Sequence, residues 1–399
     1  MKDIIFVTGT IRSQTSWPFL LAKGLSERGL NVTVISGYAN INVSDEYRNH
    51  QLANPVELLS PSFEIRRVGS RKKDPQSLVG RALKYVKLTI DIAKELNKSE
   101  ADLYLLYSTP PFLGLLGRRL TRKGNKTIYI AQDLFPDNLF AVKPAIQRSV
   151  IGGLLRRIEH QIYDSNTHII TVSETMKRTI EKNSSSTPID VIYNWANIDE
   201  LHHVNRIDNS LFDEYCIDRN KFIVSYAGSL GPLQNIDLLL DVARRFKDNR
   251  DVEFVIFGRG VNQVLLEKRI RNEMMTNVKL LPIQSSEKIS EVYSLGDLEY
   301  VSVGEGVMNM ACPHKILDIF TVGSAILAVI DMDCDMARII SDNELGIVAS
   351  SVDEIEMGIN ELLYKRTRIA VMGSNSRQFA EKVDYKKQIA KYIRVIEDC

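Results

Sequence analysis

Apolar runs of strand length alternate with amphipathic segments of helix length along almost the whole chain, and this alternation limits the fold strongly. It is typical of α/β proteins with parallel sheets. The first series of expected strands is Ile4–Thr8, Asn31–Ser36, Phe63–Val68, Leu103–Tyr107, Thr127–Ala131, His168–Val172 and Asp190–Tyr193. A second series follows at Phe222–Ala227, Glu253–Phe257, Val278–Leu281, Leu298–Val303 and Ala325–Ile330. Because the pattern starts twice, it predicts two Rossmann-like domains facing across a cleft.

Helices are expected between these strands, at Trp17–Arg28, Leu78–Leu96, Val150–Tyr163, Ile236–Phe246, Asn262–Asn272, Lys288–Leu295 and His314–Val322. The segment from Asn194 to Ile217 is irregular and polar, as expected of a linker. A length of 399 residues also suits two or three domains. We therefore predict a first domain over residues 1–195, a linker over 196–217, a second domain over 218–380 and a C-terminal helix over 381–399.

Charge is distributed unevenly along the chain. Residues 1–205 hold 27 Lys and Arg against 20 Asp and Glu, whereas the remainder holds 24 against 30. A basic first half and an acidic second half indicate different partners for the two domains. The four cysteines show no metal-type spacing, and no run approaches the ~20 apolar residues of a spanning helix. We expect a cytoplasmic protein that is not integral to a membrane.

Many of the basic residues of the first half are clustered. They are Arg71, Lys72 and Lys73, then Arg81, Lys84 and Lys87 at helical spacing, then Arg118, Arg119, Arg122 and Lys123. Leu83, Val86 and Ile90 form an apolar stripe along the expected helix. Such a face is able to lie on anionic lipid. A solvated helix face is the common alternative and stays open.

The segment from Cys312 to Gly323 indicates a helix that opens with a cation, and it follows an apolar, strand-like run at Leu298–Val303 and a short loop at Gly304–Gly306. Pro313 suits the first turn of a helix, and Lys315 and Asp318 are three residues apart on one face. First-turn N–H groups lack partners, so a helix start with a lysine makes an anion site. The acid one turn deeper is placed to hold a sugar hydroxyl. This combination indicates a site for a nucleotide diphosphate.

A second candidate phosphate loop opens the second domain. Gly228, Ser229 and Gly231 follow a strand, and a helix follows with Asn235 as its expected N-cap. A tight turn without a ligand is equally consistent with this segment alone. The loop gains weight because Lys315 lies at another strand end of the same expected sheet.

Two further strand ends of the second domain carry weaker candidates. Arg259, in Gly258-Arg259-Gly260, is able to reach a phosphate or a base. The backbone at Pro282 and Ile283 is able to bind a base edge. Plain surface loops explain both segments as well.

The candidate acceptor residues follow strands of the first domain. Asp133 and Asp137 lie four residues apart beside Phe135 and Pro136, an arrangement suited to binding or deprotonating a hydroxylated acceptor. Turn and cap roles explain the same two acids. Gly9, in the loop after the first strand, has the same two explanations.

Other chemistries lack support in the sequence. Asp331, Asp333 and Asp335 overlap in Asp-x-Asp patterns, but they follow a strand and are better explained as caps of the next helix, so we predict no metal site. The chain has no paired Cys/His motif, no Gly-x-Ser-x-Gly and no P-loop lysine motif. Zinc chemistry, serine hydrolysis and P-loop hydrolysis are therefore not expected.

Several motifs, in this order, resemble those of the family-4 retaining glycosyltransferases of GT-B fold. They are Gly29-x-Asn31-Val32-Thr33-Val34, Ile169-Ile170-Thr171-Val172-Ser173 and Tyr193-Asn194-Trp195-Ala196-Asn197. The segments Gln132–Asp137, Gly228–Asp237 and Pro313–Lys315 are most similar to the WbuB-like bacterial branch, which builds O-antigen and capsule. The resemblance covers nearly the whole chain. It implies a GT-B fold whose C-terminal helix packs back on the first domain.

The resemblance also implies a chemistry. The second domain would hold a nucleotide sugar, and the first an acceptor, with metal-independent transfer and retention at the anomeric carbon. Lys315 would neutralise the leaving diphosphate, Asp318 would bind the ribose and Gly231 would donate its N–H to a phosphate. The chain departs from the family's Glu-x7-Glu pattern, with Met310 and Asp318 at those positions, so Glu305 is the candidate replacement for the missing carboxylate.

The function expected from the sequence is transfer of a sugar, from a UDP-sugar, to a lipid-linked oligosaccharide in bacterial surface polysaccharide synthesis. Lys315, Glu305 and Asp133 are the expected catalytic residues. No cofactor and no nucleic-acid partner are expected, and the enzyme would be peripheral on the inner face of the cell membrane. Two alternatives stay open: a nucleotide-sugar epimerase of the same fold, and a non-catalytic sugar-nucleotide binding protein.

Overall fold

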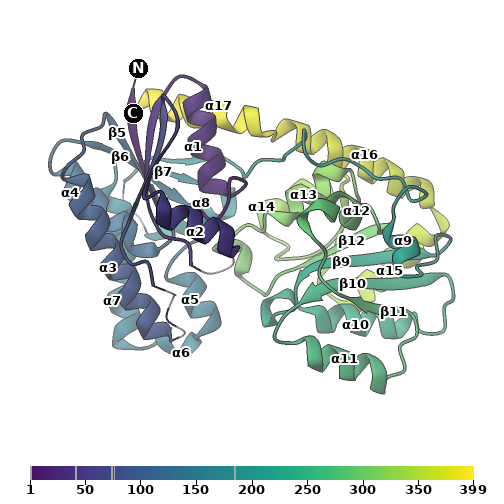
Figure 1. The fold of residues 1–399 in the computed structure, drawn as a ribbon. Helices are drawn as coiled ribbons and strands as arrows, with labels where there is room; N and C mark the ends of the chain where they lie inside the picture. The colour runs from purple at the N-terminus through teal and green to yellow at the C-terminus, as the bar shows by residue number, and fades with distance from the viewer. Residues whose placement is uncertain (1, 41–42, 73–74, 76, 184–185) are drawn as a thin grey trace. The chain divides into compact units, whose positions relative to one another are not determined.

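A computed structural model describes residues 2–40, 43–72, 75, 77–183 and 186–399, and it divides the chain into two compact α/β units (Figure 1). The first unit contains the chain up to Tyr193, together with Met310–Cys312 and Ile389–Cys399. The second unit contains Asn194–Asn309 and Pro313–Gln388. The predicted fold class, two α/β domains with largely parallel sheets, is confirmed.

The sheet of the first unit has the strand order β3-β4-β2-β1-β5-β6-β7-β8 among the described residues. Its strands are β1 (Asp3–Thr10), β2 (Asn31–Gly37), β3 (Val56–Ser60), β4 (Phe63–Val68), β5 (Leu103–Tyr107), β6 (Lys126–Ala131), β7 (His168–Thr171) and β8 (Ile189–Val191). Strand β3 pairs antiparallel with β4 at the sheet edge, and the other described pairs are parallel. The strand order reverses direction between β1 and β5. The strands that follow β1 in the sequence, up to β4, lie on one side of it in the sheet, and β5 to β8 lie on the other side.

The helices of the first unit follow the strands in chain order. They are α1 (Trp17–Glu27), α2 (Asp45–Ala53), α3 (Leu78–Leu96), η1 (Pro111–Leu115), α4 (Leu116–Thr121), α5 (Asp137–Val142), α6 (Pro144–Gln147), α7 (Val150–Ser165) and α8 (Glu174–Asn183). Helix α3 begins where the Ser77 hydroxyl accepts a hydrogen bond from the Gly80 N–H, as an N-cap does. Both α3 and α7 pack on η1.

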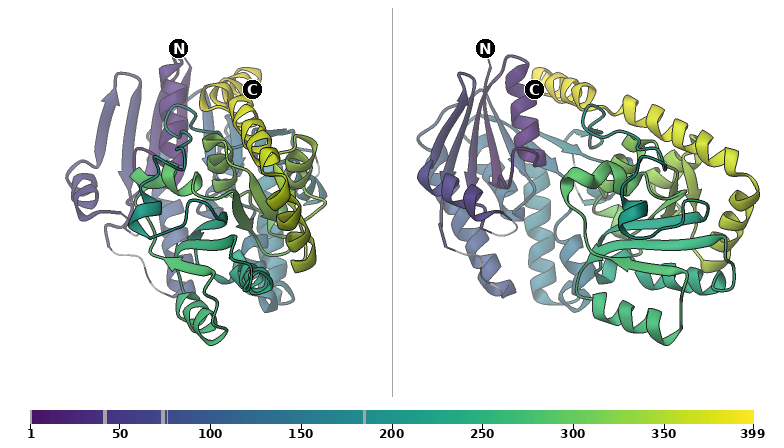
Figure 2. Two further views of the ribbon diagram at one scale, coloured as in Figure 1. Left: turned by 90° about the vertical axis from the view of Figure 1, so that its right-hand side faces the viewer. Right: turned by 45° about the vertical axis from the view of Figure 1, so that its right-hand side comes forward.

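The C-terminal helix α17 (Tyr385–Asp398) packs on the first unit from Ile389 onward, as the resemblance implied. The Tyr392 ring lies edge-on to Trp17 with centroids 6.1 Å apart. The Lys2 ammonium donates to the Ile396 carbonyl at 2.6 Å, and Figures 1 and 2 show the two ends of the chain side by side.

The sheet of the second unit has the strand order β11-β10-β9-β12-β13-β14, with parallel pairing throughout. Its strands are β9 (Phe222–Ser229), β10 (Val252–Arg259), β11 (Val278–Leu281), β12 (Leu298–Ser302), β13 (Ile326–Val329) and β14 (Gly346–Val348). The strand order reverses between β9 and β12. Ligands of open parallel sheets bind at the carboxyl ends of the strands beside such a reversal.

Helices cover both faces of the second sheet. In chain order they are α9 (Leu211–Glu214), η2 (Pro232–Gln234), α10 (Ile236–Arg245), α11 (Gln263–Asn272), η3 (Ser286–Lys288), α12 (Ile289–Tyr293), η4 (Val307–Asn309), α13 (Lys315–Val322), α14 (Asp335–Asp342), α15 (Val352–Tyr364) and α16 (Arg366–Lys382). Helix α10 packs with α15 on one face, and α12, α13 and α16 pack on the other (Figure 1).

Two elements that the sequence analysis left unassigned are edge strands, β3 and β14. Val56 and Leu58 of β3 are 59% and 70% exposed, so this strand lacks the continuous buried run of central strands such as β1 and β5. The helix predicted from His314 begins at Lys315 instead, and Pro313 precedes the N-cap residue His314 rather than lying in the first turn. Lys315 therefore occupies the first helical position.

Candidate functional site

The candidate donor site lies in the second unit at the reversal between β9 and β12. Gly228 and Ser229, expected in a loop, are the last two residues of β9, and the Gly228–Gly231 segment (called the loop below) turns away from the sheet only after Ser229. The chain after β12 leads through residues 303–314 to α13. These two segments bring together Gly228 and Lys315, which lie 87 residues apart in the sequence. The placement follows from parallel pairing, because the carboxyl ends of neighbouring parallel strands lie at one edge of a sheet.

The Lys315 ammonium is packed against the base of this loop. Its Nζ lies 4.3 Å from the centroid of the Tyr226 ring and 3.4 Å from the Ala227 carbonyl oxygen. A Cβ at Gly228 would come within 3.1 Å of Nζ. The absence of a side chain at this position therefore leaves room for the ammonium, and the ring face attracts it.

Burial lowers the pKa of Lys315 to about 8, and the Glu299 carboxylate acts in the opposite direction. Glu299 is itself buried inside β12, and burial raises its pKa to about 8. Its carboxylate accepts hydrogen bonds from the Ser225 hydroxyl and, at 3.2 Å, from the Gly296 N–H. The sequence analysis missed Glu299, although an acid inside the apolar run Leu298–Val303 was an available signal.

Two buried tyrosines beneath the sheet end hold the loop that follows β9. The Tyr226 hydroxyl donates to the Ser229 carbonyl at 2.6 Å, and the Tyr300 hydroxyl donates to the Asn235 carbonyl at 3.1 Å. Asn235 stands at the N-cap position of α10 in a left-handed conformation with φ of 45°. Asn235 is therefore the N-cap residue, as predicted, although its side chain accepts no hydrogen bond from the first turn of the helix.

Arg259 ends β10, directly beside the loop. Its backbone is in register with Ser229, and its carbonyl accepts from the Leu230 N–H at 3.0 Å. The flanking Gly258 and Gly260 pack closely against Leu230, where a Cβ would meet atoms at 2.7 Å and 2.3 Å respectively. Arg259 is exposed, and its backbone lies beside the candidate phosphate loop.

Pro282 and Ile283 follow the edge strand β11, with β10 between them and β9. Both are exposed. The Pro282 carbonyl accepts from the Gln284 side-chain amide at 2.9 Å. These two residues lie on the same side of the sheet as the loop, but one strand further from Gly228.

The two acids expected beside Lys315 have different surroundings. The Asp318 carboxylate faces His314, with Oδ1 and Nδ1 3.5 Å apart. Burial opposes a charge on His314, but the bond to Asp318 outweighs it and raises the pKa of the histidine. Glu305 is exposed on the loop after β12, and the next residue, Gly306, donates its N–H to Asp331 at 2.9 Å. Met310 is buried and offers no charge.

In the first unit, Asp133 follows β6 and is half-buried, and its withdrawal from water raises the pKa of its carboxyl group. The Ser108 hydroxyl accepts hydrogen bonds from the Asp133 N–H at 3.3 Å and the Gln132 N–H at 3.1 Å. Asp137 is bound instead by Arg156, whose Nη1 lies 3.0 Å from Oδ2. The structure therefore gives Asp137 an ion-pair partner that the sequence analysis did not identify.

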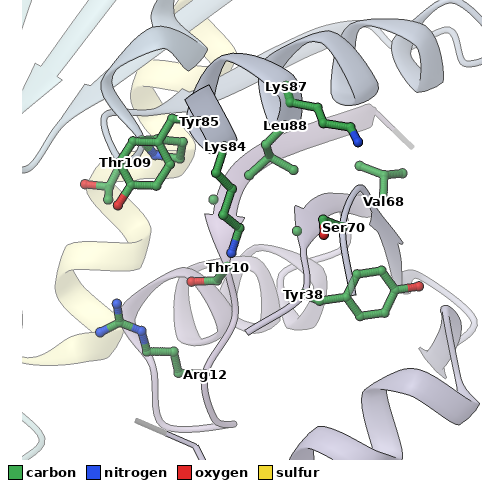
Figure 3. A pocket seen from close by; sticks show the side chains of 13 residues that line it. Thr10, Arg12, Tyr38, Val68, Ser70, Lys84, Tyr85, Lys87, Leu88 and Thr109 are labelled. Carbon is green, nitrogen blue, oxygen red and sulfur yellow. The ribbon is translucent and has the colours of Figure 1, made fainter. Parts of the chain in front are cut away.

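Gly9 lies where the end of β1 crosses the loop after β5. Its N–H donates to the Thr109 carbonyl at 2.9 Å, and a Cβ would come within 2.4 Å of the Pro110 ring. Close backbone packing is thus sufficient to require glycine here. Gly9 also lines a pocket between α3 and the strand ends, together with Arg12, Lys84 and Lys87 (Figure 3).

The described residues contain no group of three or more His, Cys, Asp or Glu side chains placed to hold a metal ion. Of the acids rejected as metal ligands, Asp335 begins α14, although its N-cap is Cys334. Lys73 of the predicted basic cluster lies outside the described residues. Leu83, Val86 and Ile90 of the apolar stripe are 65%, 43% and 51% exposed. Within the described chain, no helix has the length and apolar character needed to span a bilayer.

Two family descriptions match consecutive parts of the chain. Glycosyltransferase Family 4 matches residues 19–200, and Glycosyl transferases group 1 matches residues 208–379. The putative colanic acid biosynthesis glycosyl transferase WcaI of Escherichia coli K12 is 25% identical over 289 residues, 69% of each chain. The probable glycosyltransferase WbjE of Pseudomonas aeruginosa is 25% identical over 247 residues, 61% of each chain.

Solved structures share the fold over the whole chain. Sucrose-phosphate synthase from Thermosynechococcus elongatus superposes with a TM-score of 0.78 at 12% identity, covering 100% of this chain and 99% of the other. HepE from Anabaena, in complex with UDP-glucose, gives a TM-score of 0.71 at 14% identity, with both chains fully covered. WaaG, a glycosyltransferase involved in lipopolysaccharide biosynthesis, gives 0.70 at 13% identity, covering 99% of each chain.

Proposed function

Because the chain belongs to the family-4 glycosyltransferases of GT-B fold, we propose that it transfers a sugar from a UDP-sugar to a lipid-linked saccharide during the synthesis of a bacterial surface polysaccharide. One observation carries the donor assignment: the Lys315 ammonium lies at the base of the Gly228 loop, at the strand reversal of the second sheet. The named complex of HepE with UDP-glucose supports the choice of UDP.

The diphosphate of the donor binds the Lys315 ammonium and the N–H groups of the loop that includes Gly231. As the bond to the sugar breaks, negative charge develops on the leaving diphosphate, and a fixed cation beside it lowers the barrier. Lys315 takes the part that a metal ion takes in other transferases. The reaction retains the anomeric configuration, Asp318 binds the ribose, and Glu305 contacts the donor sugar in place of the carboxylate missing at Met310.

The acceptor binds the first domain, where Asp133 contacts the attacking hydroxyl. Its half-buried carboxyl group has a raised pKa, and this makes it a stronger base than an exposed aspartate once it is ionised. The basic first domain and the exposed aliphatic residues of α3 hold the enzyme peripherally on an anionic membrane, where a lipid-linked acceptor would lie.

UDP binding to Lys315→Ala tests the donor assignment. We expect the dissociation constant, measured by isothermal titration calorimetry, to rise about a hundredfold, since a charge-assisted contact to phosphate contributes up to about 3 kcal/mol. Lys268→Ala removes an exposed lysine of α11 and is the matched control. Equal UDP affinity in the Lys315→Ala variant and in the wild type would rule out the donor site.

Transfer itself is assayed with labelled UDP-sugars and a lipid extract that contains lipid-linked saccharides. We expect labelled glycolipid, the same anomeric configuration in donor and product by NMR, and an unchanged rate in excess EDTA. An inverted product contradicts retention, and loss of the rate in EDTA contradicts metal-independent transfer.

A further inference from the structure

The first unit has a pocket at the reversal of its own sheet, which we name the α3 pocket. It lies where the loops after β1, β2, β4 and β5 meet helix α3, and Arg12, Tyr38, Ser70, Lys84 and Lys87 are among its lining residues. Strand order reverses between β1 and β5, so the general rule for parallel sheets places a ligand here. The donor site occupies the corresponding position of the second sheet.

The lining of the α3 pocket is cationic. Arg12, Lys84 and Lys87 line it, and the described lining residues include no carboxylate. Figure 3 shows Lys84 extending from α3 toward Thr10, with Arg12 beyond it and Lys87 on the side of Val68. The Arg71 guanidinium, 5.4 Å from the centroid of the Tyr38 ring, adds a further positive charge nearby. Lys84 is half-buried, and this burial lowers the pKa of its ammonium group.

The polar groups of this lining suit phosphate better than a neutral sugar. A phosphate only accepts hydrogen bonds, and Arg12, the two lysines and the hydroxyl groups of Ser70 and Tyr38 are all able to donate. Sugar hydroxyls both donate and accept; the hydroxyl groups of this lining are able to accept from them, but a subsite built for a sugar commonly adds the stronger acceptor oxygens of Asp, Glu or Asn. Within the described residues, the lining contains none of these three types.

The pocket adjoins the candidate acceptor residue. Thr109 lines it, and the preceding residue, Ser108, accepts a hydrogen bond from the Asp133 N–H at 3.3 Å. The strand ends of β5 and β6, neighbours in the sheet, carry these two features. The pocket and Asp133 therefore lie at neighbouring strand ends of one sheet.

The helix that supplies the two lysines also exposes aliphatic side chains to solvent. Leu83, Val86 and Ile90 lie on its outer face, adjacent in sequence to Lys84 and Lys87. A hydrocarbon chain attached to a phosphate in the pocket would have this apolar face to follow. The combination favours a phosphate that is joined to a lipid over a free phosphorylated metabolite.

We propose that the α3 pocket binds the phosphate or diphosphate through which the acceptor saccharide is joined to its lipid. The proposal rests on the acceptor class proposed above and adds the group by which that acceptor is recognised. Arg12 and Lys87 contact the phosphate directly, and neither contributes to the donor site.

Inorganic pyrophosphate is the first probe, titrated by calorimetry into protein that is saturated with UDP so that the donor site is occupied. We expect saturable binding to the wild type, and a dissociation constant about tenfold higher in Arg12→Gln and in Lys87→Gln. Lys94→Gln is the control, because Lys94 lies on the same helix outside the pocket and is 72% exposed. No saturable binding, or equal weakening by Lys94→Gln, overturns the proposal.

Two further binding experiments identify the kind of molecule that carries the phosphate. A soluble short-chain alkyl diphosphate is expected to bind more tightly than pyrophosphate and to lose affinity in Arg12→Gln. Vesicles of phosphatidylglycerol are expected to leave pyrophosphate binding unchanged. Displacement of pyrophosphate by these vesicles would assign the pocket to bulk lipid headgroups and overturn its role in acceptor recognition.

Repeating the pyrophosphate titration in Lys315→Ala without UDP separates this proposal from the donor assignment. Suppose that UDP does not bind the wild type, while pyrophosphate binds Lys315→Ala and Arg12→Gln weakens pyrophosphate binding. The donor assignment then fails, and the phosphate site in the α3 pocket stands. If UDP binding requires Lys315 but Arg12→Gln leaves pyrophosphate binding unchanged, the donor site stands and the phosphate site fails.

Discussion

The proposed donor site of the second unit and the α3 pocket of the first both place positive charge at a sheet reversal, but the exposure of that charge differs. Lys315 is a single ammonium fixed against the Tyr226 ring and the Ala227 carbonyl, with its pKa lowered to about 8 by burial. Arg12 and Lys87 in the α3 pocket are exposed. Lys315 and Lys84 are both half-buried, so the contrast lies in Arg12 and Lys87. A half-buried cation that is fixed in place acts strongly on charge that develops beside it, whereas exposed cations attract an anion through a more screened field.

Gly228→Ala gives the largest expected effect on activity, because the added methyl group would displace the Lys315 ammonium of the proposed donor site. The new Cβ would lie 3.1 Å from Lys315 Nζ and 3.0 Å from the Tyr226 hydroxyl, at a φ of 152° that favours glycine. Displacing the ammonium should lower kcat/KM for the UDP-sugar about a hundredfold. Steady-state kinetics at saturating acceptor measure this loss.

Gly124→Ala is the matched control for this substitution. Gly124 also has a positive φ, of 85°, but a Cβ there would meet no atom within 4 Å. This variant should lose some stability and retain its kcat/KM. A comparable loss of activity in both glycine variants would mean that backbone strain, rather than the Lys315 contact, explains the result.

The pH dependence of donor use is the second test of the same contrast. Lys315 is protonated below its pKa of about 8 and neutral above it, so kcat/KM for the UDP-sugar should fall about tenfold per pH unit above pH 8. Replacing Glu299 by Gln removes the carboxylate that raises the pKa of Lys315, and the break should move to lower pH. A profile that stays level to pH 10 would contradict a charge requirement at Lys315.

Tyr226→Phe separates the two contacts of one side chain. The ring beneath Lys315 is retained, while the 2.6 Å bond to the Ser229 carbonyl is lost. Loss of one hydrogen bond contributes about 1 kcal/mol, so KM for the UDP-sugar should rise about fivefold while the pH break remains near 8. Tyr300→Phe, which removes the 3.1 Å bond to Asn235 further along the loop, should have a smaller effect on KM. A pH break shifted by Tyr226→Phe would show that the hydroxyl, rather than the ring, sets the pKa of Lys315.

The residues around Lys315 show which features of a site are predictable from the sequence and which are not. Gly228 and Lys315 could be paired in advance because each follows a strand of one parallel sheet, and strand ends are recognisable from apolar periodicity. Glu299 could not be linked to Lys315, since its role depends on the pairing of β12 with β9, which places it opposite Ser225. The spacing of residues within one strand does not tell which residue of the neighbouring strand lies opposite each of them.

The first unit was less predictable because its contacts join distant segments. The spacing of Asp133 and Asp137 suggested a shared acceptor role, yet Arg156 of α7 binds Asp137. The lining of the α3 pocket comes from four strand ends and one helix, so its charge is visible only after the sheet is assembled. The sequence did place Lys84 and Lys87 on one helix, but as part of a surface patch rather than a pocket.

Ionic strength gives the smallest expected effect and compares the two regions in one titration series. Raising NaCl from about 50 to about 500 mM shortens the Debye length from roughly 14 Å to roughly 4 Å. Exposed Arg12 and Lys87 should lose most of their long-range attraction, so pyrophosphate binding in UDP-saturated protein should weaken several-fold. UDP binding in the absence of pyrophosphate should change less, because the Lys315 ammonium is held against Tyr226 and away from bulk ions. Equal salt dependence at the two sites would mean that both hold their cations in the same solvent environment, and the distinction between a fixed, half-buried charge at Lys315 and the exposed charges of Arg12 and Lys87 would fail.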